Sequence, residues 1–366
     1  MSFWPEGDRG FQEALCVLKD NTSSLDNAEV FPTASLGVLG DAGVLGWVIP
    51  REYGGSEFSG AELVEGYLQL ARACLPTTFV LTQRNAACQR FALSENEPLK
   101  AELLPQLVGS ARFVTVGISH LTTSRQHLSQ PAVRVKLAEG RIQLDGVVPW
   151  VTGAGQADWV LTGGSCEDGR QVLVALPMDS RGITVLPAQD LLALDSSQTA
   201  SIQLENVLVD EGLLVAGPVE GVMHSGGRGG TGSLGTSALA LGAASSSLER
   251  LAEEARNRPE LDEVLDLMTS EWEQVAGDVL SASGEAADSQ APELTNESLR
   301  QRSNSLVLRA AQAHLAASKG AGFTASHSAS RSVRESMFFL VWSCPQAVVA
   351  ANLREFAGLL DGPTAC

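Results

Sequence analysis

The hydrophobic period of this sequence changes twice along the chain, and these changes limit the folds that it can adopt. Up to about residue 111, apolar residues recur at the i, i+3, i+4 spacing of an amphipathic helix, in residues 11–19, 60–73 and 98–108. Between about residues 112 and 215, apolar and polar residues alternate, as they do in half-buried strands. A linker rich in glycine and serine, residues 217–235, then leads back to the helical period.

The alternating part consists of short strands separated by turn residues. Residues 133–137 and 141–145 form a clear hairpin around an Ala-Glu-Gly turn. Further strands are expected at residues 113–119, 159–163, 171–177, 183–186 and 200–204. The helices that follow are expected at residues 236–256, 263–281, 297–318, 331–342 and 346–359. Short strands at this spacing favour an antiparallel barrel or sandwich between two helical parts.

Composition narrows the class of protein and of partner. The net charge of −18 argues against nucleic acid, because neutralising phosphates needs clustered Lys and Arg. The apolar runs are too short to cross a bilayer, and the N-terminus lacks the basic and apolar regions of a signal peptide. We therefore expect a cytoplasmic protein without a membrane segment. The six cysteines are scattered, with no histidine at ligand spacing, so no metal site is predicted.

Residues 146–158 are the stretch best suited to a flat ligand. Trp150 and Thr152 follow a strand and precede small residues, so an aromatic plane, a hydroxyl and open backbone come together. This combination suits a heteroaromatic ring that needs stacking and in-plane hydrogen bonds. The alternative is an ordinary strand end with a buried tryptophan.

Two other patterns have structural explanations that fit them better than a functional one. Residues 230–235 read Gly-Thr-Gly-Ser-Leu-Gly, which matches a dinucleotide-binding loop, but no buried strand precedes them. A linker that begins a helix explains them better. His120 and His127 flank a group of hydroxyls and one arginine, Thr122, Thr123, Ser124 and Arg125, which suits the edge of a flavin or a phosphate.

Taken in order, these features resemble the acyl-CoA dehydrogenase family from about Leu45 to the C-terminus. Residues 45–55, Leu-Gly-Trp-Val-Ile-Pro-Arg-Glu-Tyr-Gly-Gly, look like the N-terminal signature of that family, and residues 113–125 occupy the place of its flavin-contacting stretch. Trp150-Val-Thr152 looks like its Trp-x-Thr. Residues 242–258 and 319–323, with Arg334-Glu335, look like its C-terminal four-helix bundle.

The resemblance implies an α+β fold in three domains: an N-terminal α-helical domain (1–111), a central antiparallel β-barrel (112–215) and a C-terminal four-helix bundle (216–366). It implies FAD between barrel and bundle, and a homodimer or homotetramer. The implied reaction oxidises the Cα–Cβ bond of an acyl thioester, carried by CoA or by a carrier protein. Trp150 and Thr152 would contact the flavin ring, with Thr122, Thr123, Ser124 and Arg125 at its polar edge, and Arg258 would face the substrate or the cofactor phosphates.

The sequence departs from the family at positions that concern catalysis. Ser343 stands where the family has its catalytic Glu, and a neutral hydroxyl cannot remove an α-proton without a partner base. Some relatives carry the base on the preceding long helix, where this chain has Glu254 and Glu260, although both also fit a solvated helix face.

Two further departures concern the cofactor and the substrate. The family segment after Arg258 that reaches the partner subunit's FAD is absent, and the Gly-rich linker replaces an Asp/Arg pair that supports CoA-ester binding.

Three functional interpretations therefore stay open. The first is a flavin-dependent oxidoreductase that acts on an acyl thioester with Ser343 at the usual position of the base. The second is a flavin-dependent monooxygenase on the same fold, which does not need that base. The third is a non-catalytic relative, because fold alone does not fix function.

Overall fold

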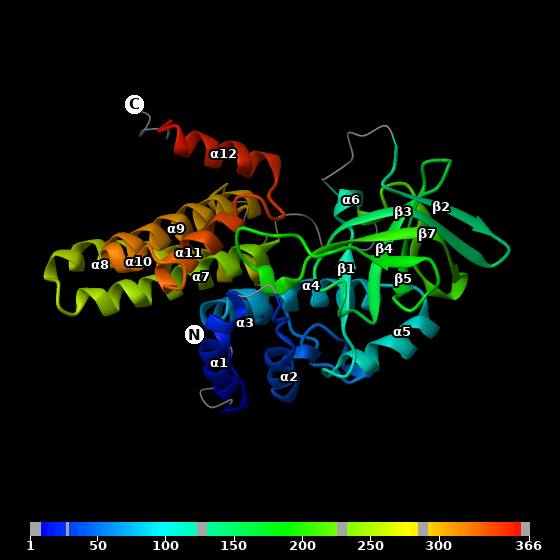
Figure 1. Cartoon of the computed structure of the whole chain (residues 1–366), viewed down its shortest axis with the longest axis horizontal. Helices are drawn as coiled ribbons and strands as arrows, with labels where there is room; N and C mark the ends of the chain where they lie inside the picture. The colour runs from blue at the N-terminus through cyan, green and yellow to red at the C-terminus, as the bar shows by residue number, and fades with distance from the viewer. Residues whose placement is uncertain (1–8, 27–28, 123–129, 225–232, 285–291, 360–366) are drawn as a thin grey trace.

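The computed structural model of the protein describes residues 9–26, 29–122, 130–224, 233–284 and 292–359. Figure 1 shows a β-sheet at one end of the molecule, long helices at the other, and the N-terminal helices along one side of both. The predicted fold class, helices followed by a β-sheet domain and a helical domain, is confirmed. None of the described helices is long and apolar enough to cross a membrane.

A side-chain cap marks the start of α3, one of the N-terminal helices. Helix α3 starts after Ser59, whose hydroxyl accepts a hydrogen bond from the backbone of Glu62 while the Glu62 carboxylate accepts one from Ser59. The helices are α1 (Arg9–Asn21), α2 (Thr33–Asp41), α3 (Gly60–Ala73), α4 (Leu75–Ala92) and α5 (Glu97–Leu103), with the 3₁₀ turns η1 (Thr22–Asp26), η2 (Val44–Gly46), η3 (Arg51–Tyr53) and η4 (Leu104–Leu107).

The periodicity did not predict helices α2 and α4, and α4 is the longer of the two. Apolar and polar side chains alike are buried along it, including Thr77, Arg84 and Asn85. The Arg84 guanidinium donates hydrogen bonds to the carbonyl oxygens of Leu45 and Leu107, so it joins three segments of the N-terminal part. A helix enclosed on nearly all sides has no polar face, and therefore no amphipathic signal.

The sheet has eight strands in the hydrogen-bonded order β6-β7-β3-β2-β4-β5-β8, with β1 paired to β4. Its strands are β1 (Val114–Gly117), β2 (Val133–Ala138), β3 (Arg141–Val151), β4 (Trp159–Ser165), β5 (Gln171–Pro177), β6 (Ile183–Val185), β7 (Ala200–Asp210) and β8 (Leu214–Val219). Most pairs are antiparallel as expected, whereas β1 and β2 each pair with β4 in parallel.

Several strands differ from the sequence expectation. Strand β3 runs six residues past the predicted hairpin, to Val151, so that Trp150 belongs to the sheet. Strand β8 reaches Val219, into the region predicted to be a linker. The short helix α6 (Ser119–Thr122) ends the predicted first strand early.

The C-terminal part consists of long helices joined by short connections. They are α7 (Leu234–Ala255), α8 (Asp262–Ser283), α9 (Asn296–Ala317), α10 (Lys319–Gly322), α11 (Ser328–Phe338) and α12 (Gln346–Phe356), with 3₁₀ turns η5 (Asp195–Ser197), η6 (Glu211–Leu213), η7 (Val222–His224), η8 (Pro259–Leu261) and η9 (Pro292–Leu294) in the chain. Figure 1 shows α12 lying over α9, apart from the other helices. Of the glycine-rich motif at 230–235, residues 230–232 lie outside the described part, and α7 begins at Leu234.

The N-terminal helices and the C-terminal helices share one hydrophobic core. Buried residues of α1, α3, α7 and α9 form a single cluster, while two smaller clusters lie between α4, α5 and the sheet and within the sheet itself. Helices α3 and α7 approach closely at Gly242, where a Cβ atom would clash with the Leu68 carbonyl oxygen and lie 2.7 Å from Ala71 Cβ. This contact sets the distance between the two helical parts.

Gly242→Ala is expected to lower the free energy of unfolding by about 1–3 kcal/mol, because the extra methyl group must push α3 away from α7. Gly277→Ala on α8 is the matched control, since nothing lies within 4 Å of a Cβ atom there. The control should be neutral or stabilise by about 0.5–1 kcal/mol, because Ala favours a helix over Gly. Urea unfolding of the two variants would contradict this account if Gly242→Ala were the milder change.

Candidate functional site

A mostly apolar cavity of about 1750 Å³ lies where the N-terminal helices, the sheet and the C-terminal helices meet. It is larger than the roughly 300–1,000 Å³ typical of a pocket for one small ligand. Its walls come from α3, α4, β1, β3, α7, α9, α11 and the segment that joins α11 to α12. The cavity therefore has room for two ligands side by side, such as a ring system and a substrate.

Trp150 lies on the sheet side of this cavity in a strained conformation. Its φ of 56° is in the left-handed region, which bulky side chains rarely adopt, and the side chain is 56% exposed. The register of β3 against β7 shifts between Val148 and Val151, so Trp150 lies at a β-bulge within the strand. Strain combined with exposure of a large aromatic ring is unusual, and such strain concentrates at functional sites.

A row of hydroxyl groups lies beside Trp150. Thr152 and Thr199 both line the cavity and are nearly buried, and their hydroxyl oxygens lie 3.3 Å apart. The Ser197 hydroxyl lies 2.8 Å from that of Thr199 and extends the row. Ser119 donates a hydrogen bond to the carbonyl oxygen of Pro149, next to Trp150. Donors and acceptors are thus available to the edge of a flat ring that stacks on the tryptophan.

Ser343 lies across the cavity, on the segment that follows α11. It has a φ of 46°, so the backbone turns sharply there. Arg300 of α9 holds this segment by donating hydrogen bonds to the carbonyl oxygens of Phe339 (3.2 Å) and Trp342 (3.0 Å), and Asn304 donates a second bond to Phe339. The Arg300 guanidinium is fully buried, and burial lowers its pKa to about 10. Backbone carbonyls, rather than a carboxylate, stabilise this buried cation.

The cavity is almost free of charge. Among the described residues that line it there is no Asp or Glu, and the one charged side chain is Arg334 of α11. A proton-accepting carboxylate is therefore absent from the described part of the wall.

The remaining predicted residues lie elsewhere or outside the described residues. Arg258 forms an ion pair with Glu254 (2.8 Å) and donates a hydrogen bond to the carbonyl oxygen of Ala317 (2.7 Å), at the C-terminal end of α9. Glu260 is exposed on η8. None of these three lines the cavity. Thr122 does line it, while Thr123, Ser124 and Arg125 fall outside the part of the chain that the structure describes.

Several cavity residues were not identified from the sequence. Ser119, Thr199 and Gln312 carry polar groups into the cavity, and Arg334 carries its charge. Ser119 sat within a predicted strand and Gln312 within a predicted helix, so periodicity gave them no separate signal. The left-handed conformation of Trp150 was equally hidden, because a bulge has no reliable mark in a single sequence.

Comparisons with known proteins agree with the fold. The sequence profile described as "Acyl-CoA dehydrogenase, N-terminal domain" matches residues 14–110. A probable acyl-CoA dehydrogenase, YngJ, of Bacillus subtilis (strain 168) is 25% identical over 248 residues, which cover 64% of this chain and 63% of that protein. The chain thus matches somewhat less than two thirds of the length of this relative.

Solved structures show the same fold at lower identity. A glutaryl-CoA dehydrogenase from Mycobacterium smegmatis in complex with FADH2 superposes with a TM-score of 0.80 at 17% identity, over 97% of this chain and 95% of that chain. A dibenzothiophene monooxygenase, TdsC, from Paenibacillus sp. A11-2 superposes with a TM-score of 0.78 at 18% identity, over 96% of each chain.

Glu335 also lies on α11 and faces a different, small crevice. This crevice, of about 40 Å³, is lined by Lys19, Arg72, Arg250 and Arg331 among others. Burial raises the pKa of Glu335 to about 7; Asp26 adds to the rise, while Arg331 and Arg334 oppose it. The carboxyl group therefore loses its proton near neutral pH in the folded protein, and near pH 4.5 in the unfolded chain.

Glu335→Gln should stabilise the protein at pH 8 and have little effect at pH 4. A raised pKa in the folded state means that the protonated group is compatible with folding below pH 4.5, and that stability is lost as the pH rises through 7. Because the side chain is partly exposed, we expect a gain of about 1–3 kcal/mol at alkaline pH. Thermal unfolding from pH 4 to pH 8 checks this, with Glu13→Gln on the exposed face of α1 as control. Parallel pH profiles of wild type and Glu335→Gln would refute it.

Proposed function

Because this chain is a distant member of the acyl-CoA dehydrogenase family, we propose that it is a flavin-dependent oxidoreductase whose substrate is an acyl thioester. The thioester would be carried by CoA or by a carrier protein. The observation that supports this proposal is the cavity between the three parts of the fold, with Trp150 and Thr152 on one side and the Ser343 turn on the other.

The residues around Trp150 fit the flavin ring of FAD. An exposed indole can stack on the ring, and the hydroxyls of Thr152 and Ser119 are placed to exchange hydrogen bonds with its edge. Thr122, Thr123, Ser124 and Arg125 would extend this polar edge. When bound, FAD supplies an acceptor for a hydride, or in its reduced form a partner for O₂.

The apolar wall of the cavity suits the acyl group. Side chains of α3, α4 and α11 form it, including Leu63, Phe79 and Phe338. An alkyl chain placed against them would leave water, which is the main source of affinity for such a group. The wall would also keep water from the reacting carbons. The ion pair of Arg258 with Glu254 fits a structural role better than substrate binding.

Among the described residues that line the cavity, there is no carboxylate base to remove an α-proton from the substrate. Oxidation of the Cα–Cβ bond needs a base near Cα, and the resemblance places that base at Ser343. A serine hydroxyl does not act as a base alone, and no described Asp or Glu lines the cavity. This observation favours a second candidate, a flavin-dependent monooxygenase, which needs no such base.

We also propose that the protein is a homodimer or homotetramer. Leu353 and Phe356 lie one turn apart on α12, Leu359 follows three residues after the helix ends, and each of the three is more than half exposed. An apolar face of this kind is typical of an interface between subunits.

Trp150→Ala should weaken FAD binding by about tenfold or more, because the variant loses the stacking surface and its contact area. The measurement is the flavin absorbance that remains after incubation with FAD and passage over a desalting column. Phe323→Ala is the matched control, since that aromatic side chain is 84% exposed and does not line the cavity. A wild-type protein that retains no flavin would contradict the proposed function and favour the non-catalytic interpretation.

Ser343→Glu should create or raise the ability of an acyl-CoA to bleach bound flavin under anaerobic conditions, by at least about a hundredfold. The carboxylate would stand where the resemblance places the base, and Ser343→Gln, of similar size without the charge, should give no gain. Equal rates in both variants would argue against this position for the base. Wild-type turnover only with reduced flavin and O₂ would favour the monooxygenase.

A further inference from the structure

Arg334 carries the one charge among the described residues of an otherwise neutral cavity. Its neighbours on the same stretch of wall, Met337, Phe338 and Leu340, are apolar. A guanidinium beside apolar surface loses part of its hydration, which costs free energy unless a partner restores it. That partner comes from the N-terminal part of the chain.

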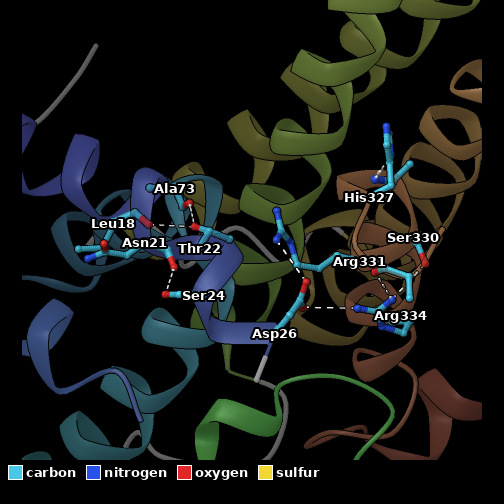
Figure 2. Close-up of polar contacts among 12 residues, drawn as sticks. Leu18, Asn21, Thr22, Ser24, Asp26, Ala73, His327, Ser330, Arg331 and Arg334 are labelled. Carbon is cyan, nitrogen blue, oxygen red and sulfur yellow. Dashed lines mark hydrogen bonds and ion pairs between the residues drawn. The ribbon is translucent and has the colours of Figure 1, made fainter. Parts of the chain in front are cut away.

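Asp26 is the acidic partner of Arg334, and it serves two arginines. Figure 2 shows the Asp26 carboxylate, at the end of η1, between Arg331 and Arg334 of α11. One oxygen lies 3.3 Å from Arg331 and the other 3.4 Å from Arg334. Charge-assisted hydrogen bonds of good geometry are about 2.7–2.9 Å long, so both contacts are loose. One carboxylate facing two guanidiniums leaves a positive charge in excess.

Glu335 offsets only part of that excess near neutral pH. It faces the small crevice with Arg331, and its raised pKa keeps it partly protonated near pH 7. The other cations of the crevice pair with other carboxylates: Lys19 and Arg72 share Glu249, and Arg250 contacts Glu253. Of the two arginines that share Asp26, Arg334 is the one that lines the large cavity.

The guanidinium of Arg334 is also held in place before any ligand arrives. Its Nη1 donates hydrogen bonds to the Ser330 hydroxyl at 3.0 Å and to the carbonyl oxygen of Ala325 at 3.3 Å, as Figure 2 shows for Ser330. These neutral acceptors orient the group without neutralising it. A cation that is fixed in advance binds an anion with less loss of side-chain entropy.

We propose that Arg334 is a specificity-determining residue that binds an oxyanion of the ligand in the large cavity, in competition with Asp26. This inference rests on the proposed function, since it concerns the same cavity. The oxyanion is either a carboxylate carried by the acyl group or a phosphate of the group that carries the thioester. In both cases a planar guanidinium with two parallel N–H donors matches the ligand.

The test uses thioesters of N-acetylcysteamine, which contain no phosphate. A short acyl group that ends in a carboxylate is compared with the same group ending in a carboxamide, by calorimetry on the full-length protein with and without FAD. Inorganic pyrophosphate is titrated separately. Wild type should bind either the carboxylate or pyrophosphate, and a preference of at least about tenfold for the carboxylate over the carboxamide assigns the oxyanion to the acyl group. Binding of pyrophosphate without that preference assigns it to a phosphate.

Arg334→Gln should abolish whichever binding is found, and Arg334→Lys should retain part of it. Arg331→Gln is the matched control, because it removes the same charge from the same Asp26 and lies outside the large cavity. Equal affinity for carboxylate and carboxamide together with no binding of pyrophosphate overturns the inference, and so does a preference that survives Arg334→Gln. If the Gln variant does not fold, the wild-type comparison alone decides.

Failure of this inference can be told from failure of the proposed function. A protein that retains flavin but shows neither the carboxylate preference nor pyrophosphate binding keeps the proposed function and loses the role of Arg334. A protein that does not bind flavin but prefers the carboxylate keeps the role of Arg334 and loses the proposed function. The two results are independent because the binding measurement does not depend on the cofactor.

Discussion

The close contact between α3 and α7 joins the two helical parts of this protein into one core. Gly242 lets the two backbones approach, and the core that forms around them includes residues of both helical parts. Helix α4, which follows α3 after a single residue, packs against β1 with its other end. The cavity is the space that remains between the N-terminal helices, the sheet and the C-terminal helices. Its size is thus a result of helix packing, and its chemistry is set by the few side chains that reach it.

The sequence was a good guide to elements with one apolar face or with clear turn signals at both ends. Residues 60–73 and 171–177 were predicted within their observed bounds, since the first has one apolar face and the second lies between clear turn signals. It was a poor guide to α4, whose polar residues Thr77, Arg84 and Asn85 are buried along with the apolar ones. Periodicity reports a difference between faces, and a fully enclosed helix has none.

Some residues of the candidate site could be identified from the sequence and others could not. Trp150 and Thr152 could be selected because an aromatic residue and a hydroxyl stand two positions apart after a strand, which is local information. Arg334 and Gln312 could not, because their role depends on a cavity shared by elements that are far apart in the chain. The ion pair of Glu254 and Arg258 illustrates the opposite case: both residues have suitable chemistry, and the fold uses them to hold the end of α9.

The buried guanidinium of Arg300 has a consequence for how such a site can change. It holds the turn after α11 through the carbonyl oxygens of Phe339 and Trp342, which every amino acid possesses. The path of the backbone therefore depends little on which side chains the turn carries. Substitutions at positions 340, 341 and 343 can alter the chemistry offered to the cavity while the scaffold stays in place. Through this separation of support from chemistry, one fold can exchange reactions during evolution without first losing its stability.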